Sequence, residues 1–337
     1  MIAIAIAHSN IALAKYWGKA DVAGNFPAVP SLSLTLDALL TITRVEFDPT
    51  LGADSALLDG EVLTGRPLSR ITTLLDRVRE RASIGFFAKV ESRNEFPTAA
   101  GLASSASGFA ALALAATRAA GLELPIDEIS GMARAASASA ARSLYGGWVA
   151  LRAGSPGAER VAAPDHFPVA MLVAVTAAGP KAVGSTEGMT HTRATSPYYA
   201  TWVNHAPVLF ERVRDAVLAR DLAALGPAVE QSALMMHASM LAADPAVIYF
   251  LPTTLAVIAR VRELRAQGTA AFFTMDAGPH VKVLTQKSAA ADVATALGEV
   301  AGVKRVIVCR PGPDAYCLDP GLDFAQAVER VRSGAGP

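Results

Sequence analysis

Cysteine is scarce in this sequence of 337 residues, since only Cys309 and Cys317 occur. They form neither a CxxC pair nor a disulfide framework, so we expect reduced thiols in a cytoplasmic protein. An excess of one charge is also lacking, because 30 Lys and Arg residues balance 30 Asp and Glu residues. This balance argues against a nucleic-acid or anionic-membrane partner, although it leaves room for a local basic pocket.

Long apolar runs and metal-ligand patterns are missing as well. The N-terminal stretch MIAIAIAHSNIALAKYWGK has no basic segment before its apolar part, which is shorter than the about 20 residues of a membrane span. We therefore expect no export signal and no transmembrane helix. The six histidines show no HExxH or comparable spacing, so we assign no residue to a metal.

Length and patterning predict an α+β protein with two lobes. The chain exceeds the size at which one hydrophobic core usually stops growing. Apolar alternation and a turn signal predict strands at 31–36, 42–47 and 86–91, a hairpin at 57–63 and further strands at 270–275, 281–285 and 303–308. Helical spacing predicts helices at about 67–82, 197–219, 221–241 and 252–267. We expect lobes at 1–180 and 181–337, with a ligand cleft at a packed join.

The stretch FPTAAGLASSASGFAALALAA, residues 96–116, holds no charged side chain. Gly101 and the neighbouring alanines let a backbone approach a ligand closely, and Ser104, Ser105 and Ser107 offer hydroxyls where a helix begins. A helix N-terminus has free N–H groups and a partial positive charge, so it binds phosphate. The stretch is neither a Walker A loop nor a GxGxxG loop. A tightly packed, alanine-rich helix with a serine-rich entry is the alternative.

Four charged residues stand in unusual surroundings. Asp276 follows the strand AAFFTM and precedes Ala-Gly-Pro, which suits either a carboxylate held rigidly in a cleft or a simple turn residue. Lys15 and Lys19 flank the segment YWG, which is odd for a solvated surface, although snorkelling lysines are the common alternative. Arg142 is isolated among small residues, so it suits a surface charge, a structural ion pair or a bidentate carboxylate contact.

Several segments together resemble the diphosphomevalonate decarboxylases of the GHMP kinase superfamily. These segments are NIALAKYWGK (10–19), PTAAGLASSASG (97–108), SASAARSLYGG (137–147), STEGM (185–189), MHASML (236–241) and FTMDAGPHV (273–281). The resemblance implies a two-lobed GHMP kinase fold, with an N-terminal lobe of mixed sheet and helices and a C-terminal ferredoxin-like lobe. It also implies ATP-dependent phosphorylation of a tertiary 3-hydroxyl, followed by loss of phosphate and carbon dioxide to give isopentenyl diphosphate.

The resemblance assigns roles to individual residues. Asp276, Lys15 and Arg142 are the implied catalytic residues, with Asp276 accepting the hydroxyl proton and Arg142 gripping the substrate carboxylate. The implied substrate-binding residues are Asn10, Tyr16, Trp17, Gly18, Lys19, Arg70, Ser137, Ser139, Arg142, Ser185 and Thr186. The implied ATP-binding residues are Pro97, Ala100, Gly101, Leu102, Ala103, Ser104, Ser105 and Ser107. Magnesium should arrive with ATP and be held largely by its phosphates, and the family suggests a homodimer.

The sequence departs from the family pattern at two places. His8-Ser9 stands where relatives tend to have a proline-containing pair, and Thr186 stands where some bacterial relatives show arginine. The second change leaves fewer cations for a diphosphate, so a decarboxylase of mevalonate 5-phosphate is an alternative. A mevalonate 3-kinase and a non-catalytic sensor on the kinase fold are the less favoured alternatives, because Lys15, Arg142 and Asp276 match the decarboxylase pattern.

Overall fold

The structure is a computed structural model that describes residues 1–21, 24–96, 104–177, 179 and 182–334. The first half contains β1 (Ile2–Ala14), β2 (Lys19–Asp21), β3 (Phe26–Pro27), β4 (Ser31–Asp48), β5 (Ser55–Leu58), β6 (Glu61–Val62), α1 (Gly65–Ala82), β7 (Phe87–Asn94), α2 (Ser104–Ala119), α3 (Ile126–Ala136), the 3₁₀ helix η1 (Ala138–Leu144), β8 (Trp148–Leu151) and β9 (Glu159–Ala162). The second half contains β10 (Val169–Val175), α4 (Ser185–Thr195), α5 (Tyr199–Ala219), α6 (Leu222–Leu241), α7 (Pro252–Ala266), β11 (Ala271–Met275), β12 (Val281–Gln286), the 3₁₀ helix η2 (Lys287–Ala289), α8 (Ala290–Gly298), β13 (Arg305–Cys309), β14 (Tyr316–Leu318) and α9 (Phe324–Arg332).

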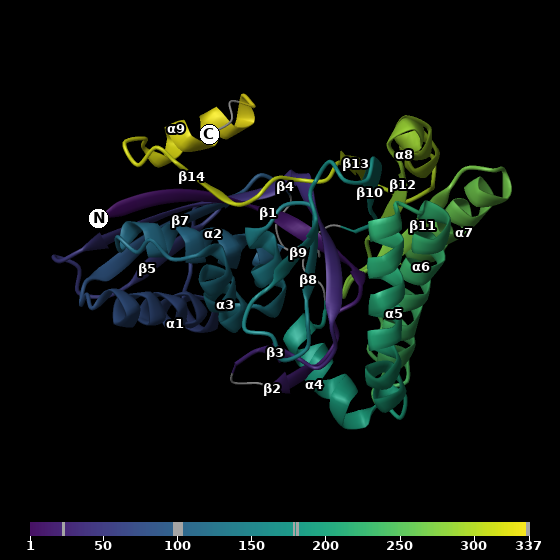
Figure 1. The fold of residues 1–337 in the computed structure, drawn as a ribbon, viewed down its shortest axis with the longest axis horizontal. Helices are drawn as coiled ribbons and strands as arrows, with labels where there is room; N and C mark the ends of the chain where they lie inside the picture. Colours follow the sequence, from purple (N-terminus) through teal and green to yellow (C-terminus); the bar gives the residue numbers. More distant parts are fainter. Residues whose placement is uncertain (22–23, 97–103, 178, 180–181, 335–337) are drawn as a thin grey trace.

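The first sheet has the strand order β14-β1-β4-β7-β5-β6, and β8 joins β4 to β9 at one end. Helices α1, α2 and α3 cover one face of this sheet, while α9 lies on the other face (Figure 1). The sequence of β1 explains this arrangement, because its alternating residues point to opposite faces. Ala3, Ala5 and Ala7 pack with α2, and Ile4 and Ile6 pack with β14 and α9. The small alanines allow the alanine-rich α2 to lie close to the strand.

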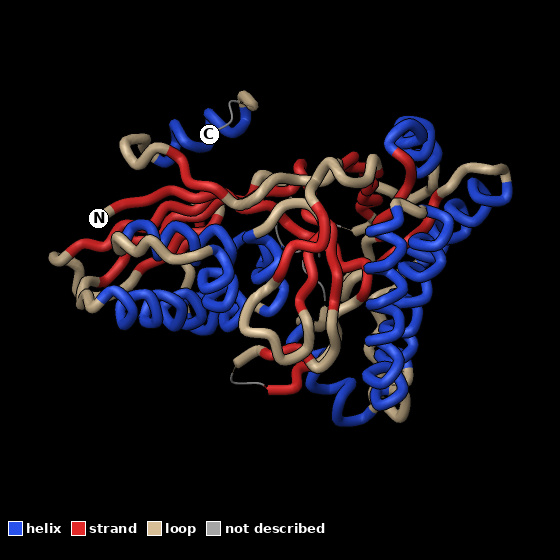
Figure 2. Tube along the Cα trace, in the orientation of Figure 1, coloured by secondary structure: helices blue, strands red, loops and turns tan. Residues whose placement is uncertain are grey.

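The second sheet has the order β11-β12-β10-β13, with antiparallel pairing throughout. Its central strand β10 is buried along its whole length. Met171 and Val173 face a core shared with α5, α6 and the first sheet, whereas Leu172 and Ala174 face α7 and α8. Figure 2 shows the helices α5 and α6 beside this sheet. A strand with helices or a second sheet on both faces is apolar at every position, which is what PVAMLVAV shows.

One hydrophobic core runs through the join between the lobes. It contains Leu32 and Leu34 of β4, Met171 of β10 and Phe210 of α5, together with Val229 of α6. The predicted packed join is therefore confirmed. Because this core fixes the end of β1 against α6, residues from both halves of the chain reach the same place.

The predicted helices and the hairpin at 57–63 are confirmed, and Asp59 and Gly60 both adopt positive φ in its turn. The strands predicted at 31–36 and 42–47 are also confirmed, although they are parts of one long strand, β4, which continues between them. The division at residue 180 does not follow the sheets. Strand β10 precedes it but belongs to the second sheet, and β14 returns to pair with β1 in the first. The hydrophobic pattern does not predict which sheet a strand joins, because a central strand is apolar in either sheet.

Within the described residues, no helix is both long and apolar enough to cross a membrane.

Candidate active site

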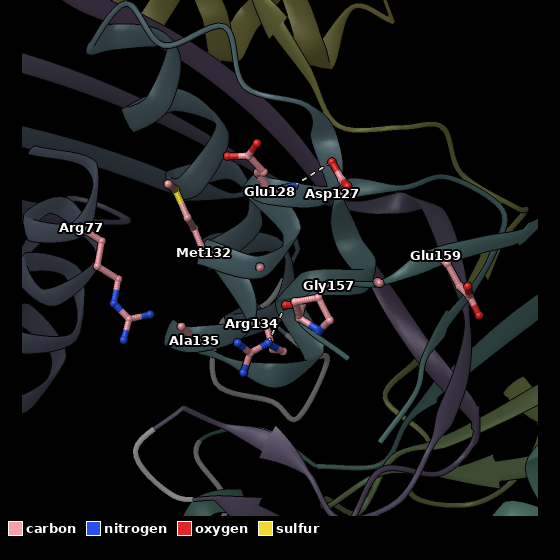
Figure 3. A pocket seen from close by; sticks show the side chains of 11 residues that line it. Arg77, Asp127, Glu128, Met132, Arg134, Ala135, Gly157 and Glu159 are labelled. Carbon is pink, nitrogen blue, oxygen red and sulfur yellow. Dashed lines mark hydrogen bonds between the residues drawn. The ribbon is translucent and has the colours of Figure 1, made fainter. Parts of the chain in front are cut away.

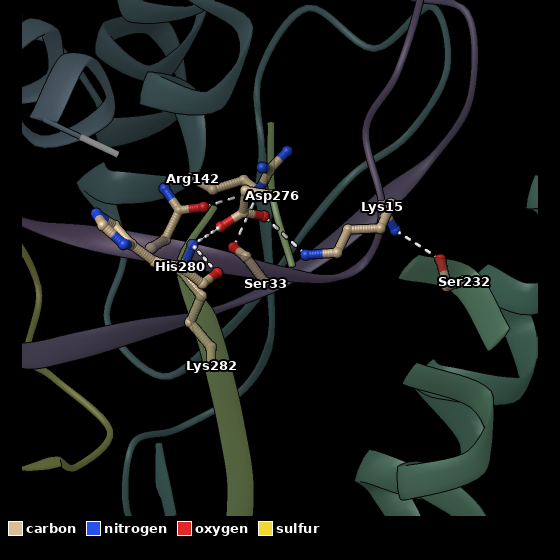
Figure 4. A network of polar contacts seen from close by, with 8 residues as sticks. Lys15, Ser33, Arg142, Ser232, Asp276, His280 and Lys282 are labelled. Carbon is tan, nitrogen blue, oxygen red and sulfur yellow. Dashed lines mark hydrogen bonds and ion pairs between the residues drawn. The ribbon is translucent and has the colours of Figure 1, made fainter. Parts of the chain in front are cut away.

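The ammonium of Lys15 meets the carboxylate of Asp276 at the join between the lobes. Lys15 Nζ donates a hydrogen bond to Asp276 Oδ1 at 2.7 Å, across 261 residues of sequence. Lys15 follows the last residue of β1, and its backbone N–H donates to Ser232 Oγ of α6 at 2.9 Å, which fixes the strand end. The side chain of Lys15 is only 1% exposed and that of Asp276 is 26% exposed. Figure 4 shows the pair, which is held rigidly, and the Asp276 side chain remains partly exposed.

A second ammonium lies on the other oxygen of the same carboxylate. Lys282 Nζ of β12 is 3.1 Å from Asp276 Oδ2, and its side chain is completely buried. Burial by itself would raise the pKa of Asp276, but the charges of Lys15 and Lys282 outweigh it and hold that pKa well below its usual range. Burial lowers the pKa of Lys15 to about 8, although Asp276 opposes that shift. The carboxylate is consequently ionised at neutral pH.

Arg142 is a buried cation beside this cluster, supported by neutral groups. Its Nε donates to Ser33 Oγ at 2.9 Å, and Nη1 donates to Ser31 Oγ at 2.7 Å. Within the described part of the chain it forms no ion pair and Nη2 makes no hydrogen bond. Burial lowers the pKa of Arg142 to about 10, so it stays charged. A buried charge without a counter-ion is costly, which suits a site that awaits an anionic ligand.

Asn10 and Tyr16 surround Arg142 in different ways. The Asn10 amide donates to the Ser139 carbonyl and to Ser143 Oγ, and its oxygen accepts from Arg142 Nε at 3.3 Å. Asn10 thus holds η1 and the arginine in place from a buried position. Tyr16 is mostly enclosed, and its hydroxyl has no hydrogen-bond partner among the described residues. An enclosed hydroxyl without a partner is suited to a ligand.

The loop after Lys15 is fixed by residues from the second half of the chain. The Trp17 indole is buried in a hydrophobic cluster, and its carbonyl accepts from the indole N–H of Trp202 at 2.8 Å. Gly18 adopts a φ of 109°, and a side chain there would begin 2.1 Å from the hydroxyl of Tyr199. Packing therefore explains both residues without a substrate. Their substrate-binding role stays a prediction.

Lys19, Arg66, Arg70 and Arg193 form a group that we call the cation cluster. Burial and then Arg70 and Arg66 lower the pKa of Lys19, and burial and then Arg66 lower the pKa of Arg70. Arg193 of α4 donates to the Lys19 carbonyl at 3.0 Å. Among the described side chains, no carboxylate pairs with any of the four. Like charges that crowd together without an acidic partner favour an anionic ligand.

The predicted phosphate loop is only partly described. Pro97, Ala100, Gly101, Leu102 and Ala103 lie outside the described residues. Helix α2 begins at Ser104, and Ser105 is exposed in its first turn, so both hydroxyls are accessible. Ser107 is different, because it is fully buried and its hydroxyl lies 2.7 Å from Thr41 Oγ1 and 3.0 Å from Ser9 Oγ. This geometry makes Ser107 an anchor between α2 and the first sheet.

The remaining predicted substrate contacts lie on neighbouring elements. Ser137 and Ser139 are half-buried at the start of η1, with their hydroxyl oxygens 3.3 Å apart. Ser185 and Thr186 begin α4, which packs against Trp17 through Gly188. Arg70 donates to the Ala136 carbonyl and lies over the ring of Phe109. All of these elements adjoin either the Lys15–Lys19 loop or η1, so the predicted residues gather in one region.

A separate surface hollow of about 590 Å³ lies between α3 and the loop before β9 (Figure 3). Its most buried cation, Arg134, donates to the Pro156 carbonyl and lies over the ring of Phe26. The arginine therefore ties α3 to two loops. The residues lining this hollow do not include Lys15, Arg142, Asp276 or Lys282.

Sequence reasoning missed Lys282, Arg66 and Arg193. Lys282 stands in an apolar strand, VKVLT, and a lysine at an otherwise buried position is a signal that could have found it. Arg66 lies on α1, a helix with many exposed charges, and Arg193 is an exposed arginine of α4. The approach of both to Lys19 depends on tertiary packing. No local pattern predicts it.

Comparison with known proteins gives a consistent result. Residues 7–163 match the diphosphomevalonate decarboxylase-like N-terminal domain, and residues 171–311 match the mevalonate 5-diphosphate decarboxylase C-terminal domain. The diphosphomevalonate decarboxylase of Candida albicans is 32% identical, over 90% of this chain and 94% of that protein. The phosphomevalonate decarboxylase of Haloferax volcanii is 33% identical, over 85% of this chain and 88% of that protein.

Solved structures agree in fold. The mevalonate diphosphate decarboxylase of Staphylococcus aureus is 37% identical with a TM-score of 0.90, covering 95% of this chain and 99% of that one. The complex of MDDEF with MVAPP, AMPPCP and magnesium is 39% identical with a TM-score of 0.89 and the same coverage. The predicted GHMP kinase fold is thereby confirmed. Both halves of the chain lead to one conclusion: this protein belongs to the diphosphomevalonate decarboxylase family.

Proposed function

We propose that this protein catalyses the ATP-dependent decarboxylation of (R)-5-diphosphomevalonate to isopentenyl diphosphate, with release of ADP, phosphate and carbon dioxide. The observation that carries the proposal is the ionised Asp276 beside Lys15 and next to Arg142, which has no acidic partner in the described part of the chain. A carboxylate and a free buried cation at one place suit a substrate that carries both a hydroxyl and a carboxylate.

In the first step, Asp276 orients the 3-hydroxyl of the substrate and accepts its proton as the oxygen attacks the terminal phosphorus of ATP. The O–H bond and the P–O bond of ATP break, the new O–P bond forms, and ADP leaves. Such transition states are loose, so the hydroxyl becomes acidic only as the O–P bond forms. A carboxylate of lowered pKa is therefore basic enough. Lys15 stabilises negative charge on the 3-oxygen and its phosphate.

In the second step, phosphate leaves from carbon 3. The bond between carbon 2 and the carboxylate carbon breaks, its electrons form the double bond between carbons 2 and 3, and carbon dioxide departs. Arg142 holds that carboxylate in a fixed orientation through its free edge. Because Ser31, Ser33 and Asn10 fix the guanidinium from behind, its position is set before the substrate arrives. The guanidinium therefore need not reorient before the reaction, which lowers the entropic part of the barrier.

ATP supplies the phosphoryl group, and a related structure holds AMPPCP with magnesium. The accessible Ser104 and Ser105 at the start of α2 suit nucleotide phosphates, as the N–H groups of a helix N-terminus do in general. The described residues contain no group of three or more His, Cys, Asp and Glu side chains arranged for a metal. We propose that magnesium arrives with ATP and is held largely by phosphate oxygens.

The cation cluster favours a 5-diphosphate over a 5-monophosphate, because the diphosphate carries more negative charge. Arg66 and Arg193 supply the positive charge that Thr186 lacks. We expect Arg66→Met and Lys19→Met each to raise the KM for the diphosphate about 10- to 100-fold, since hydrogen bonds to charged groups are worth about 1.5–3 kcal/mol. Steady-state kinetics measures this. Lys89→Met, an exposed lysine of β7, is the control and should leave KM unchanged.

Product analysis tests the function directly. Mevalonate, its 5-phosphate and its 5-diphosphate are offered in parallel with ATP, and ADP, carbon dioxide and the organic product are quantified. We expect carbon dioxide chiefly from the 5-diphosphate. Preferred turnover of the 5-phosphate would identify the alternative decarboxylase, and ADP without carbon dioxide would identify a 3-kinase. Absence of ADP formation with every substrate would indicate a non-catalytic protein.

Several finer assignments belong to the same proposal. We infer a homodimer from the family, and analytical ultracentrifugation tests it. We infer a cytoplasmic protein from the two cysteines, both of which are free. For the lobes, we propose a boundary between β9 and β10, because the sheets change there and the two domain matches end and begin at residues 163 and 171.

A further inference from the structure

Lys282 is a completely buried lysine whose ammonium contacts the carboxylate of Asp276. Its side chain is 0% exposed, and its Nζ lies 3.1 Å from Asp276 Oδ2 and donates to the His280 carbonyl at 3.4 Å. It comes from β12, where it pairs in register with Thr274 of β11, the strand that ends just before Asp276. Figure 4 shows Lys282 and Lys15 approaching the carboxylate from different elements.

Titratable side chains from several elements surround Asp276. Lys15 extends from the end of β1, Arg142 lies on η1, and Lys282 lies on β12. His237 of α6 is also close, but burial lowers its pKa to about 3, so it is neutral at working pH. His280 is a neighbour whose Nδ1 accepts from the Thr176 N–H at 3.1 Å. Two cations therefore contact this carboxylate, and Arg142 acts on it through its charge without a direct contact.

We propose that Lys282 is a positioning residue for phosphoryl transfer, which holds Asp276 Oδ2 so that Oδ1 stays beside Lys15 and the carboxylate stays ionised. The proposal rests on the proposed role of Asp276. Each oxygen then has one ammonium, and rotation of the carboxylate would break both contacts. The two polar contacts of Lys282 are Asp276 Oδ2 and the His280 carbonyl, so we assign its effect to Asp276 and not to the substrate.

The alternative is that Lys282 only stabilises the fold through an ion pair with Asp276. Its surroundings argue that stability alone does not explain a buried lysine here. Burying an ion pair is often no more stabilising than an apolar packing of the same volume. The neighbours of Lys282 along β12, Val281 and Val283, are apolar and lie in the core. Burying a lysine at this position costs desolvation free energy. We attribute its presence to the orientation and ionisation of the Asp276 carboxylate.

The test is the pH dependence of turnover in Lys282→Met and Lys282→Gln. Without the cation, the pKa of Asp276 rises, so the acid limb of kcat/KM moves upward into or above the ordinary carboxyl range near about 4. Lys15 loses a like charge that lowers its pKa, so its value rises above about 8 and the basic limb also moves upward. We expect both limbs to move by about one pH unit or more. Turnover at neutral pH should fall roughly 10- to 100-fold, because the carboxylate is misplaced.

Thr274→Val is the matched control. Thr274 is the cross-strand neighbour of Lys282, it is buried, and its hydroxyl has no partner among the described residues. Its removal should leave both limbs in place. A second readout is a double-mutant cycle with Asp276→Asn, in which Lys282→Met should have no further effect on kcat if it acts through Asp276. Lys282→Gln tests the same charge if the Met variant does not fold.

The outcomes separate the two proposals. Unchanged limbs in folded Lys282 variants, with turnover abolished in Asp276→Asn, would overturn the role of Lys282 alone. An undiminished effect of Lys282→Met in the Asp276→Asn background would also overturn it, since Lys282 would then act by another route. Near-normal turnover in Asp276→Asn would instead overturn the proposed function of the carboxylate.

Discussion

Replacing Asp276 by asparagine should lower kcat by roughly 10²–10⁴-fold, the usual contribution of a positioned general base. An amide oxygen does not accept a proton, although asparagine can make the same turn hydrogen bonds as aspartate. The variant should still bind both ligands, because Arg142 and the cation cluster are untouched. Formation of ADP and release of carbon dioxide should fall together, since the first step precedes the second. Single-turnover kinetics with separate detection of ADP and carbon dioxide measures both.

This variant also has a structural cost that a simple turn residue would not have. Lys15 and Lys282 would both lose their counter-charge in a buried place, so we expect a lower Tm as well as lower turnover. Thermal unfolding and binding measurements at a temperature where the variant is folded separate the two effects. A folded variant that binds both ligands and releases carbon dioxide at near the wild-type rate would return Asp276 to a structural role.

Replacing Arg142 should impair turnover even when the positive charge is kept. Arg142→Lys loses the planar fork and its bonds to Ser31 and Ser33, so the carboxylate is no longer held in a fixed orientation. Since charge-assisted hydrogen bonds are worth about 1.5–3 kcal/mol each, we expect kcat/KM to fall about 10- to 100-fold in Arg142→Lys. The fall should be larger in Arg142→Gln, which also loses the charge.

Arg134→Lys is the control for replacing a buried arginine, because Arg134 binds main-chain carbonyls in the hollow of Figure 3. It should affect stability more than kcat. Partition between phosphorylation and decarboxylation gives a further readout, because Arg142 is proposed to act on the carboxylate. If Arg142→Lys and Arg142→Gln both turn over like the wild type, the proposed contact with the carboxylate is wrong.

The sequence by itself determined the elements and the class of protein. Helical spacing located α1 and α5 to α7, and the Asp59-Gly60 pair located the first hairpin, because these signals depend on neighbours in the chain. The motif segments also indicated the family, since each keeps its residues within a few positions of one another. Asp276, Lys15 and Arg142 could be named for the same reason.

Only the tertiary structure decided which of these residues meet and what supports them. Lys15 and Asp276 are 261 residues apart, and Lys282 joins them only because β11 and β12 pair in register. Ser107 looked like a phosphate ligand in the sequence, but packing of α2 on the first sheet turns its hydroxyl toward Thr41. The pKa values follow the same logic, because desolvation and the charges of distant segments set them. Local pattern carries the secondary structure, whereas the electrostatics of the site arise from contacts between segments far apart in the chain.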